Sequence, residues 1–319
     1  MDVIYYSETF DGFLENTGAT IGVFDGVHVG HQELIGALIK ESKALLVTPT
    51  VITFNRHPDY YLNPRKAPKM LSSLNQRLRW FNQLGVKKVL VIEFNKEFAS
   101  IKAEDFIKEI LLKKLKTKLI VVGKNFKFGY KRLGDTALLE RLSKPFGYQL
   151  EIFGPFEHKG NVVSSTLVRS LVNQGDIQSA QEFLGRPYQI EGVVVKGDGR
   201  GLQLGYPTAN IATSPEILWP PNGIYAGAIE VPGVGNFKTA VSIGNRPTFY
   251  DEGPRALEAY LLDFSGNLYD KEVFLSFFKK LRNEIKFKTV EDLLVQMVTD
   301  VQEVRNLDYK IDLWQKKKS

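Results

Sequence analysis

Two histidines, His28 and His31, are the first residues whose types and spacing suggest chemistry. They stand three apart in the stretch IGVFDGVHVGHQELIGALIK and are half of the four histidines in the chain. Gly22, Gly26 and Gly30 let the backbone turn tightly between a strand-like run and an amphipathic run. The amino end of the helix that follows offers free N–H groups and a positive dipole end, and residues i and i+3 project from one turn of it. The pattern therefore predicts a phosphate site.

Two other interpretations of this pair stay open. The histidines are purely structural residues where the helix begins, or they are two ligands of a metal ion. The metal pair has no third histidine nearby, and the chain has no cysteine.

A second group of polar residues follows a glycine-rich segment in the C-terminal half. Thr208 and Asn210 lie two apart in the tetrapeptide PTAN, so in an extended strand both side chains face the same side. Their hydroxyl and amide oxygens suit Mg²⁺ that bridges ATP phosphates. The segment KGDGRG before them is neither a Walker loop nor a dinucleotide fingerprint, but its glycines admit phosphates, and Lys196 and Arg200 supply positive charge. A plain turn and a mobile hairpin are the structural alternatives.

One carboxylate, Glu258, stands in the otherwise apolar run ALEAYLL. Such a residue either faces water on an edge strand or is placed for chemistry. A carboxylate within hydrogen-bond reach of an alcohol takes the proton that an alcohol must lose before it attacks a phosphate.

The N-terminal half alternates between strand-like and helix-like segments from residue 18 to residue 156. Apolar runs predict buried parallel strands at residues 20–24, 45–54, 88–94, 119–123 and 149–153. Between them, residues 74–84 and 103–115 have apolar side chains at three- and four-residue spacing, which predicts helices. This order predicts an α/β fold with a doubly wound parallel sheet, whose ligands bind at the carboxyl ends of the strands.

The C-terminal half has a different rhythm. Two short helices are predicted at residues 166–173 and 177–183, and β-rich runs separated by Gly, Pro and Asn turns follow them. These runs predict an antiparallel β-barrel or sandwich, with a long terminal helix at residues 290–304 packed across it. We place the boundary near residues 184–187, which gives domains 1–184 and 185–319.

Composition limits the classes of protein that need to be considered. The chain has 319 residues, enough for two domains, and 43% of them are hydrophobic. It has no cysteine, no apparent signal peptide and no run near the roughly 18 apolar residues of a spanning helix, so we expect a cytoplasmic protein without a membrane partner. The net charge of +6 favours anionic partners, and nucleotide phosphates satisfy it as well as nucleic acid does. The basic cluster at residues 316–318 is typical of a solvated tail.

The histidine motif, with its position after the first strand, resembles the nucleotidyltransferase superfamily. The segment SSTLVR late in the same domain matches the second signature of that superfamily. With TFNRHP and VVGKNFKFG between them, the motifs are similar to the FAD synthetase module of the bifunctional riboflavin kinase/FAD synthetase family. Arg56 departs from the proline usual in that family. The resemblance implies a nucleotidyltransferase (Rossmann-like) sheet that binds ATP through Gly22, Phe24, Asp25, His28, His31, Ser164, Ser165, Thr166 and Arg169. It implies flavin contacts from Phe54, His57, Asn125, Phe126 and Phe128, although these aromatic side chains are also typical of a plain core.

The segment GDGRGLQLGYPTAN is very similar to the signature of riboflavin kinase, except that Leu202 replaces a usual basic residue. The resemblance implies ATP contacts from Lys196, Gly197, Gly199, Arg200, Gly205, Pro207, Thr208 and Asn210. It makes Thr208 and Asn210 the Mg²⁺ ligands and Glu258 the catalytic base. Arg282, in LRNEIKF, is implied to lie near the flavin, with a surface salt bridge as its structural alternative.

Together these resemblances imply a bifunctional enzyme that makes FMN from riboflavin and then FAD from FMN, using ATP and Mg²⁺ at two separate sites. His28 and His31 then serve an already ionised phosphate nucleophile, whereas Glu258 serves a neutral alcohol. One rival is a nucleotidyltransferase of another specificity with an RNA-binding barrel, which the aromatic pattern of the barrel disfavours. The other is a C-terminal flavin sensor without catalysis. We therefore expect small-molecule partners and no nucleic acid; the sequence leaves the oligomeric state open.

Overall fold

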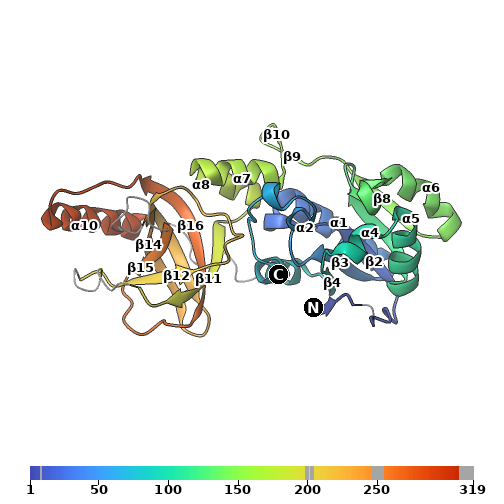
Figure 1. Cartoon of the computed structure of the whole chain (residues 1–319), viewed down its shortest axis with the longest axis horizontal. Coiled ribbons are helices and arrows are strands. Elements are labelled where there is room, and N and C mark those ends of the chain that lie inside the picture. The colour runs from blue at the N-terminus through green and yellow to red at the C-terminus, as the bar shows by residue number, and fades with distance from the viewer. Residues whose placement is uncertain (8, 198–200, 202–204, 246–254, 309–319) are drawn as a thin grey trace. The chain divides into compact units, whose positions relative to one another are not determined.

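The computed structural model describes residues 1–7, 9–197, 201, 205–245 and 255–308. The chain divides into two compact units, which Figure 1 shows as a mainly blue-to-green part and a mainly yellow-to-red part. Unit 1 contains Met1–Met70 and Leu74–Ser164, and unit 2 contains Leu71–Ser73 and Ser165–Ser319. Six residues of the predicted nucleotide loop, 198–200 and 202–204, lie outside the described residues; they include Gly199, Arg200 and Leu202. The basic tail lies outside them as well.

Unit 1 is built on a six-stranded sheet in which every pairing is parallel. Its strands, in spatial order, are β1 (Asp2–Tyr5), β4 (Lys88–Ile92), β3 (Thr48–Phe54), β2 (Thr17–Ile21), β5 (Thr117–Gly123) and β8 (Gln149–Phe153). The chain runs outward from β2 to β4 and then returns to the other side of β2 with β5 and β8. This order confirms the predicted doubly wound sheet. Strand β1, to which the sequence pattern gave no element, extends the sheet beside β4.

Strands β2, β3, β4 and β5 have boundaries that differ by two or three residues from the sequence-based prediction, and two of these differences have a clear backbone cause. Strand β2 ends at Ile21 rather than at Phe24, because Phe24 has a φ of 51° and the chain has already left the extended conformation. Strand β3 begins at Thr48, because α1 continues to Ala44 and Leu46 has a φ of 55°. The apolar runs at 20–24 and 45–54 predict continuous strands, but each contains one residue with a left-handed backbone, Phe24 or Leu46, that lies outside the strand.

Helices and short hairpins connect these strands. The helices of unit 1 are η1 (Asp25–Val27), α1 (Val29–Ala44), α2 (Asp59–Leu62), η2 (Pro64–Lys66), α3 (Leu74–Leu84), α4 (Lys96–Ser100), α5 (Ala103–Asp105), η3 (Phe106–Lys114), η4 (Tyr130–Arg132) and α6 (Thr136–Phe146). Two small hairpins complete it: β6 (Lys127–Phe128) with β7 (Gly134–Asp135), and β9 (Glu157–His158) with β10 (Asn161–Val162). The predicted helix at 103–115 is mostly the π-helix η3, which ends with a hydrogen bond from Leu115 N–H to Ile110 O of 2.9 Å.

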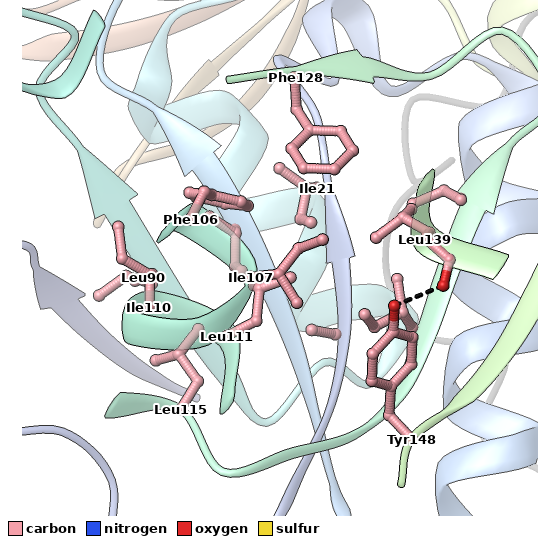
Figure 2. Packing of buried hydrophobic residues seen from close by; sticks show 14 of the residues in the cluster. Ile21, Leu90, Phe106, Ile107, Ile110, Leu111, Leu115, Phe128, Leu139 and Tyr148 are labelled. Atoms are coloured by element: carbon pink, nitrogen blue, oxygen red, sulfur yellow. Dashed lines mark hydrogen bonds between the residues drawn. The ribbon is translucent and has the colours of Figure 1, made fainter. Parts of the chain in front are cut away.

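Side chains alternate along the strands between two apolar clusters, one on each face of the sheet. Figure 2 shows the first cluster, in which Ile107 and Leu111 of η3 pack together with Ile21 of β2. In the same cluster the Tyr148 hydroxyl donates to Leu139 O at 2.5 Å, and burial raises the pKa of Tyr148 to about 12. The second cluster joins α1 and α3 to the alternate positions of the same strands. Both faces are therefore covered, as a parallel sheet requires.

Unit 2 contains a closed antiparallel barrel of six strands. They are, in order around the barrel, β11 (Tyr188–Val195), β12 (Thr208–Ala212), β15 (Arg255–Leu261), β14 (Gly235–Asn245), β13 (Gly223–Val231) and β16 (Glu272–Arg282). Before the barrel come α7 (Ser165–Gln174) and α8 (Ile177–Leu184), and after it comes α10 (Val290–Asn306), which Figure 1 shows beside the barrel wall. Closure decides between the barrel and the sandwich. No helix in the described part of the chain is both long enough and apolar enough to cross a bilayer.

The packing of α1 on β2 gives a first test of this fold. A side chain at Gly18 of β2 would press on the buried Ser42 hydroxyl of α1, whereas a side chain at Gly36 of α1 would meet open space. We expect Gly18→Ala to lower the free energy of unfolding by about 1–3 kcal/mol through overpacking. We expect Gly36→Ala to raise it by about 0.5–1 kcal/mol.

The measurement is the midpoint of urea unfolding at constant m-value for the two variants and the parent chain. Equal shifts of the two midpoints would contradict the close packing of α1 on β2.

Candidate active sites

The first candidate site lies where the strands of the parallel sheet end. Strands β2 and β5 are neighbours, but the chain leaves them toward opposite sides of the sheet, so they form its switch point. The histidine motif directly follows β2, and the segment GKNFKFG begins where β5 ends. Ligands of doubly wound sheets bind in the crevice at such a point. The fold therefore brings these two motifs to one edge of unit 1.

The two histidines are stacked at the start of α1. Their ring centroids are 3.6 Å apart with an interplanar angle of 15°. His28 is the N-cap residue, and its Nδ1 accepts a hydrogen bond from the His31 N–H at 3.3 Å. This contact engages Nδ1 of His28 within the start of the helix. Two imidazoles thus lie beside a helix amino end, where the partial positive charge favours an anion; phosphate binding there stays a prediction from the sequence.

The predicted nucleotide contacts before the histidines form a tight turn. Phe24 is in the left-handed region and is buried, and its ring meets that of His31 edge-on at 5.1 Å. Asp25, the next residue, is also buried. A Cβ at Gly30 would lie 3.3 Å from the Cβ of Phe156, so the chain before the β9–β10 hairpin packs against this helix start. The loop is therefore packed closely, through the Phe24 ring against His31 and through Gly30 against Phe156.

The predicted flavin contacts of unit 1 divide into aromatic and polar residues. The Phe126 and Phe128 rings stack at 5.2 Å, and Phe54 belongs to the same apolar cluster as both of them. Asn125 is exposed, whereas the Nδ1 of His57 accepts the Asp59 N–H at 3.1 Å. Both interpretations of the aromatic residues thus stay open: Phe128 is buried core, while Phe54 and Phe126 are only partly buried.

The serine–arginine motif forms the start of α7, as predicted from its capping residues. Ser165 is the first helical residue, Thr166 is exposed and Arg169 is partly buried. Ser164 is the last residue of unit 1, and the rest of the motif belongs to unit 2. Its role in binding ATP together with the histidines stays a prediction from the sequence.

One residue of this region escaped the sequence analysis. Arg77, on α3, is fully buried, and its guanidinium donates to Val23 O at 2.8 Å, to Phe54 O at 2.9 Å and to Asn55 O at 3.1 Å. Burial lowers its pKa to about 10. The signal was present in the sequence, since Arg77 precedes Trp80 and Phe81 by three and four residues on the apolar face of α3. A charged residue on such a face indicates a buried partner.

The second candidate site is a row of side chains across the barrel. Asn210 of β12 is paired with Glu258 of β15, and Glu258 is paired with Ser242 of β14 on its other side. Ser242 is paired in turn with Ile224 of β13, and Ile224 with Arg282 of β16. Directly opposed residues of antiparallel strands share one face of the sheet. Five strands therefore bring the predicted base, one predicted metal ligand and the predicted flavin contact onto a single surface.

Glu258 lies in the closed wall of the barrel, on a strand that is paired on both sides. Its neighbours Leu257 and Ala259 are buried, whereas Glu258 is partly exposed on the opposite face. The Thr208 hydroxyl donates to Glu258 Oε2 at 3.1 Å. The interpretation of Glu258 as an edge-strand residue is therefore wrong, because this barrel has no edge at β15.

A cavity of about 210 Å³ opens over this row. Thr208, Glu258 and Arg282 line it together with Met297 and Asp300 of α10. Arg282 also forms an ion pair with Asp300, with Nη2 2.7 Å from Oδ2 and Nε 3.0 Å from Oδ1. Arg282 thus lines the pocket and is held in an ion pair that is largely buried rather than superficial; its contact with a flavin stays a prediction. The sequence analysis missed Asp300 and Met297, which share a face of α10 at three-residue spacing.

The predicted metal ligands fit a magnesium ion chemically. Thr208 and Asn210 lie two apart on β12, as the PTAN pattern predicted. The Thr208 hydroxyl donates a hydrogen bond to Glu258, so its oxygen lone pairs are directed elsewhere and can face a cation. The described residues contain no cluster of three or more His, Asp or Glu side chains placed to hold a metal. Two neutral oxygens suit an ion that keeps several waters and binds phosphate oxygens.

The described parts of the glycine-rich segment lie next to these ligands. Gly197 lies so close to the Asn210 amide that a Cβ there would overlap it. Gly205 has a φ of 81°, which few other residues adopt. Lys196 and Pro207 are exposed. Gly197 therefore serves close backbone approach to Asn210, which a plain turn would not require, whereas Gly205 serves a left-handed backbone conformation.

Two family models match separate parts of the chain. The family model of FAD synthetase matches residues 12–167, and that of riboflavin kinase matches residues 184–307. Bifunctional riboflavin kinase/FMN adenylyltransferase from Buchnera aphidicola is 35% identical, and the alignment covers 91% of this chain and 93% of the relative. The protein of that name from Escherichia coli is 36% identical, with coverage of 88% and 89%. The crystal structure of a macrolide-efflux protein from Streptococcus pneumoniae is 28% identical, with a TM-score of 0.86 over 97% of this chain and all of the other.

The ion pair of Arg282 and Asp300, which both line the cavity of unit 2, gives a second test. Asp300→Ala leaves the guanidinium of Arg282, whose side chain is 17% exposed, without its carboxylate. We expect a loss of about 3–5 kcal/mol in the free energy of unfolding, because an uncompensated buried charge is costly.

The matched control is Asp263→Ala, which removes the bidentate partner of Arg305 at a site where both side chains are largely exposed. Solvent screens that pair, so its loss should be much smaller. Equal urea midpoints for the two variants would show that burial does not decide the strength of the Arg282–Asp300 pair.

Proposed function

This chain belongs to the family of bifunctional riboflavin kinase/FMN adenylyltransferases, and we propose which of its side chains carry each of the two reactions. The enzyme transfers the γ-phosphoryl group of ATP to riboflavin, which gives FMN and ADP. It also transfers the adenylyl group of a second ATP to FMN, which gives FAD and pyrophosphate. The first reaction belongs to the C-terminal region and the second to the N-terminal region.

Glu258 is the general base for the phosphorylation of riboflavin. The 5′-hydroxyl of riboflavin loses its proton to the Glu258 carboxylate, its oxygen forms a bond to the γ-phosphorus, and the bond to ADP breaks. The observation that carries this proposal is the place of Glu258 on the wall of the cavity, with one oxygen held by the Thr208 hydroxyl. This hydrogen bond fixes the orientation of the carboxylate, so that its other oxygen can accept the proton of the alcohol.

Thr208 and Asn210 hold Mg²⁺ at the same site. When bound, the ion neutralises charge on the ATP phosphates. Lys196, Gly197 and Gly205, with Gly199, Arg200 and Pro207 of the same segment, form the ATP side of the site. Arg282 contacts the flavin, and its pairing with Asp300 keeps its guanidinium fixed beside the cavity.

Adenylylation needs no base, because its nucleophile is the phosphate of FMN, which is mostly ionised at pH 7 given a second pKa of about 6. An FMN phosphate oxygen bonds to the α-phosphorus of ATP, and the bond to pyrophosphate breaks. His28 and His31 at the start of α1 stabilise the charge on the ATP phosphates, assisted by Ser164, Ser165, Thr166 and Arg169. The stacking of the two imidazoles at the helix amino end supports this role.

Three further properties belong to the same proposal. We place the boundary between the two functions near residues 184–187; the riboflavin kinase match begins at residue 184, whereas the compact units divide after Ser164. The absence of cysteine from the 319 residues supports a reducing, cytoplasmic location. The partners of both sites are small molecules rather than nucleic acid.

Removing the carboxylate of Glu258 tests the first site. We expect Glu258→Gln to lower kcat for FMN formation by about 10²–10⁴-fold, because an amide cannot accept the proton of the alcohol. Conversion of supplied FMN to FAD by the same protein should stay unchanged. The measurement is chromatography of flavins after incubation with ATP and Mg²⁺.

Glu272→Gln is the control, since Glu272 is an exposed residue of barrel strand β16 outside the cavity. Normal FMN formation by Glu258→Gln would exclude Glu258 as the base.

Removing an imidazole tests the second site. We expect His31→Ala to lower kcat/KM for FMN adenylylation by about 10²–10³-fold, the usual cost of one lost group that stabilises transition-state charge. Riboflavin added to this variant should accumulate as FMN.

Lys40→Ala is the control, because Lys40 is an exposed residue of the same helix, α1. A variant His31→Ala that still makes FAD at the parent rate would place the adenylylation site elsewhere.

A further inference from the structure

We propose that Arg77 is a positioning residue for FMN adenylylation, which fixes the loop after β2 relative to the loop after β3. The first loop carries the histidine motif, and the second carries TFNRHP with His57. The inference rests on the proposed location of adenylylation at the carboxyl edge of the sheet of unit 1. It concerns a side chain that belongs to none of the motifs from which that location was argued.

The hydrogen bonds of the guanidinium reach both loops at once. Nη1 donates to Val23 O, two residues beyond the end of β2, at 2.8 Å. The same nitrogen donates to Thr53 Oγ1 at 2.9 Å and to Phe54 O at 2.9 Å, and Nη2 donates to Asn55 O at 3.1 Å. The Thr53 hydroxyl in turn donates to Val23 O at 3.2 Å. One planar fork thus satisfies carbonyl groups from two strand ends.

Burial makes this arrangement costly to break. Arg77 has no exposed surface, so its polar atoms cannot turn to water when a partner is lost. Its guanidinium interacts electrostatically with Asp25, which is buried in the turn before His28. The positive charge of Arg77 therefore favours the ionised form of a buried acidic side chain in the loop that carries the histidine motif.

The consequence for the reaction is geometric. In an in-line displacement the attacking phosphate and the α-phosphorus must be aligned, and a misplacement of about 1 Å costs on the order of 10²-fold in rate. The strands that lead into the histidine loop and the TFNRHP loop, β2 and β3, are paired as far as Ile21 and Ile52. One more backbone hydrogen bond, from Gly22 N–H to Ile52 O, follows this last pair. Past that point the Thr53 hydroxyl, which donates to Val23 O, and the Arg77 guanidinium link the two loops, and Arg77 alone among these two also reaches Asn55 O.

The test compares two reactions within one chain. We expect Arg77→Met to lower kcat/KM for FMN adenylylation by about 10²-fold. Phosphorylation of riboflavin by the same molecules should stay within about twofold of the parent. Arg77→Lys retains the charge beside Asp25 and some of the donors, so its kcat/KM for adenylylation should lie between those of the parent and Arg77→Met.

Val89→Ala is the control for a purely structural role. Val89 is buried in the cluster that α3 shares with the sheet, near the start of β4 and away from the loops. This variant should lower the urea midpoint while adenylylation stays within about threefold of the parent. If Arg77→Met folds poorly, Arg77→Gln takes its place, with an expected loss of at least about tenfold.

The proposal is overturned if Arg77→Met or Arg77→Gln keeps kcat/KM for adenylylation within about threefold of the parent, or if both reactions fall in parallel. His31→Ala separates this inference from the function on which it rests. Loss of adenylylation in His31→Ala with retention in Arg77→Met defeats the role of Arg77 alone. Retention in His31→Ala defeats the proposed site, and the inference with it.

Discussion

Both candidate sites depend on the fixed register of hydrogen-bonded strands. Once two strands are paired, each side chain is committed to one face and each strand end to one edge, and a slip of one residue would reverse every face. In the barrel this constraint carries Asn210, Glu258 and Arg282 from separate strands onto one surface. In the parallel sheet it delivers the loops after β2, β3 and β5 to a common edge.

In the roles that we propose for Glu258 and the two histidines, the two units solve opposite chemical problems with the groups that this register provides. Phosphorylation starts from a neutral alcohol, and the barrel presents a carboxylate held by the Thr208 hydroxyl on the wall of a cavity. Adenylylation starts from a phosphate that is already charged, and the sheet presents two stacked imidazoles at a helix amino end. A base is needed in the first case, whereas positioning and charge stabilisation suffice in the second.

Arginine has a supporting role in both units. Arg77 is buried among backbone carbonyl groups, and Arg282 is buried beside the carboxylate of Asp300. A planar guanidinium with several donors can tie separate chain segments together at fixed angles, which a lysine ammonium does less well. The cost of taking these charges out of water is offset only while their partners stay in place, so each arginine fixes the geometry around it.

The sequence by itself determined the class of both units and most of the chemistry. Apolar runs alternating with helical patterns indicated the doubly wound sheet, and the β-rich runs indicated an antiparallel second unit, because hydrophobic periodicity is local information. The motifs around His28, His31, Thr208, Asn210 and Glu258 named the candidate residues, and the PTAN spacing correctly placed Thr208 and Asn210 on one strand.

Only the tertiary structure decided which side chains share a surface. Closure of the barrel removed the edge on which Glu258 would have faced water, and no local pattern encodes closure. The partner of Arg282 is on a helix 18 residues further along the chain, and the carbonyl groups that hold Arg77 belong to strand ends 22 to 54 residues away. Strand β2 ends before Phe24, which adopts a left-handed conformation in the loop, against the preference of an apolar run. Contacts between residues distant in sequence arise from packing, so a single sequence does not reveal which residues they join. The one hint it gave here was a charged residue, Arg77, on an apolar helix face.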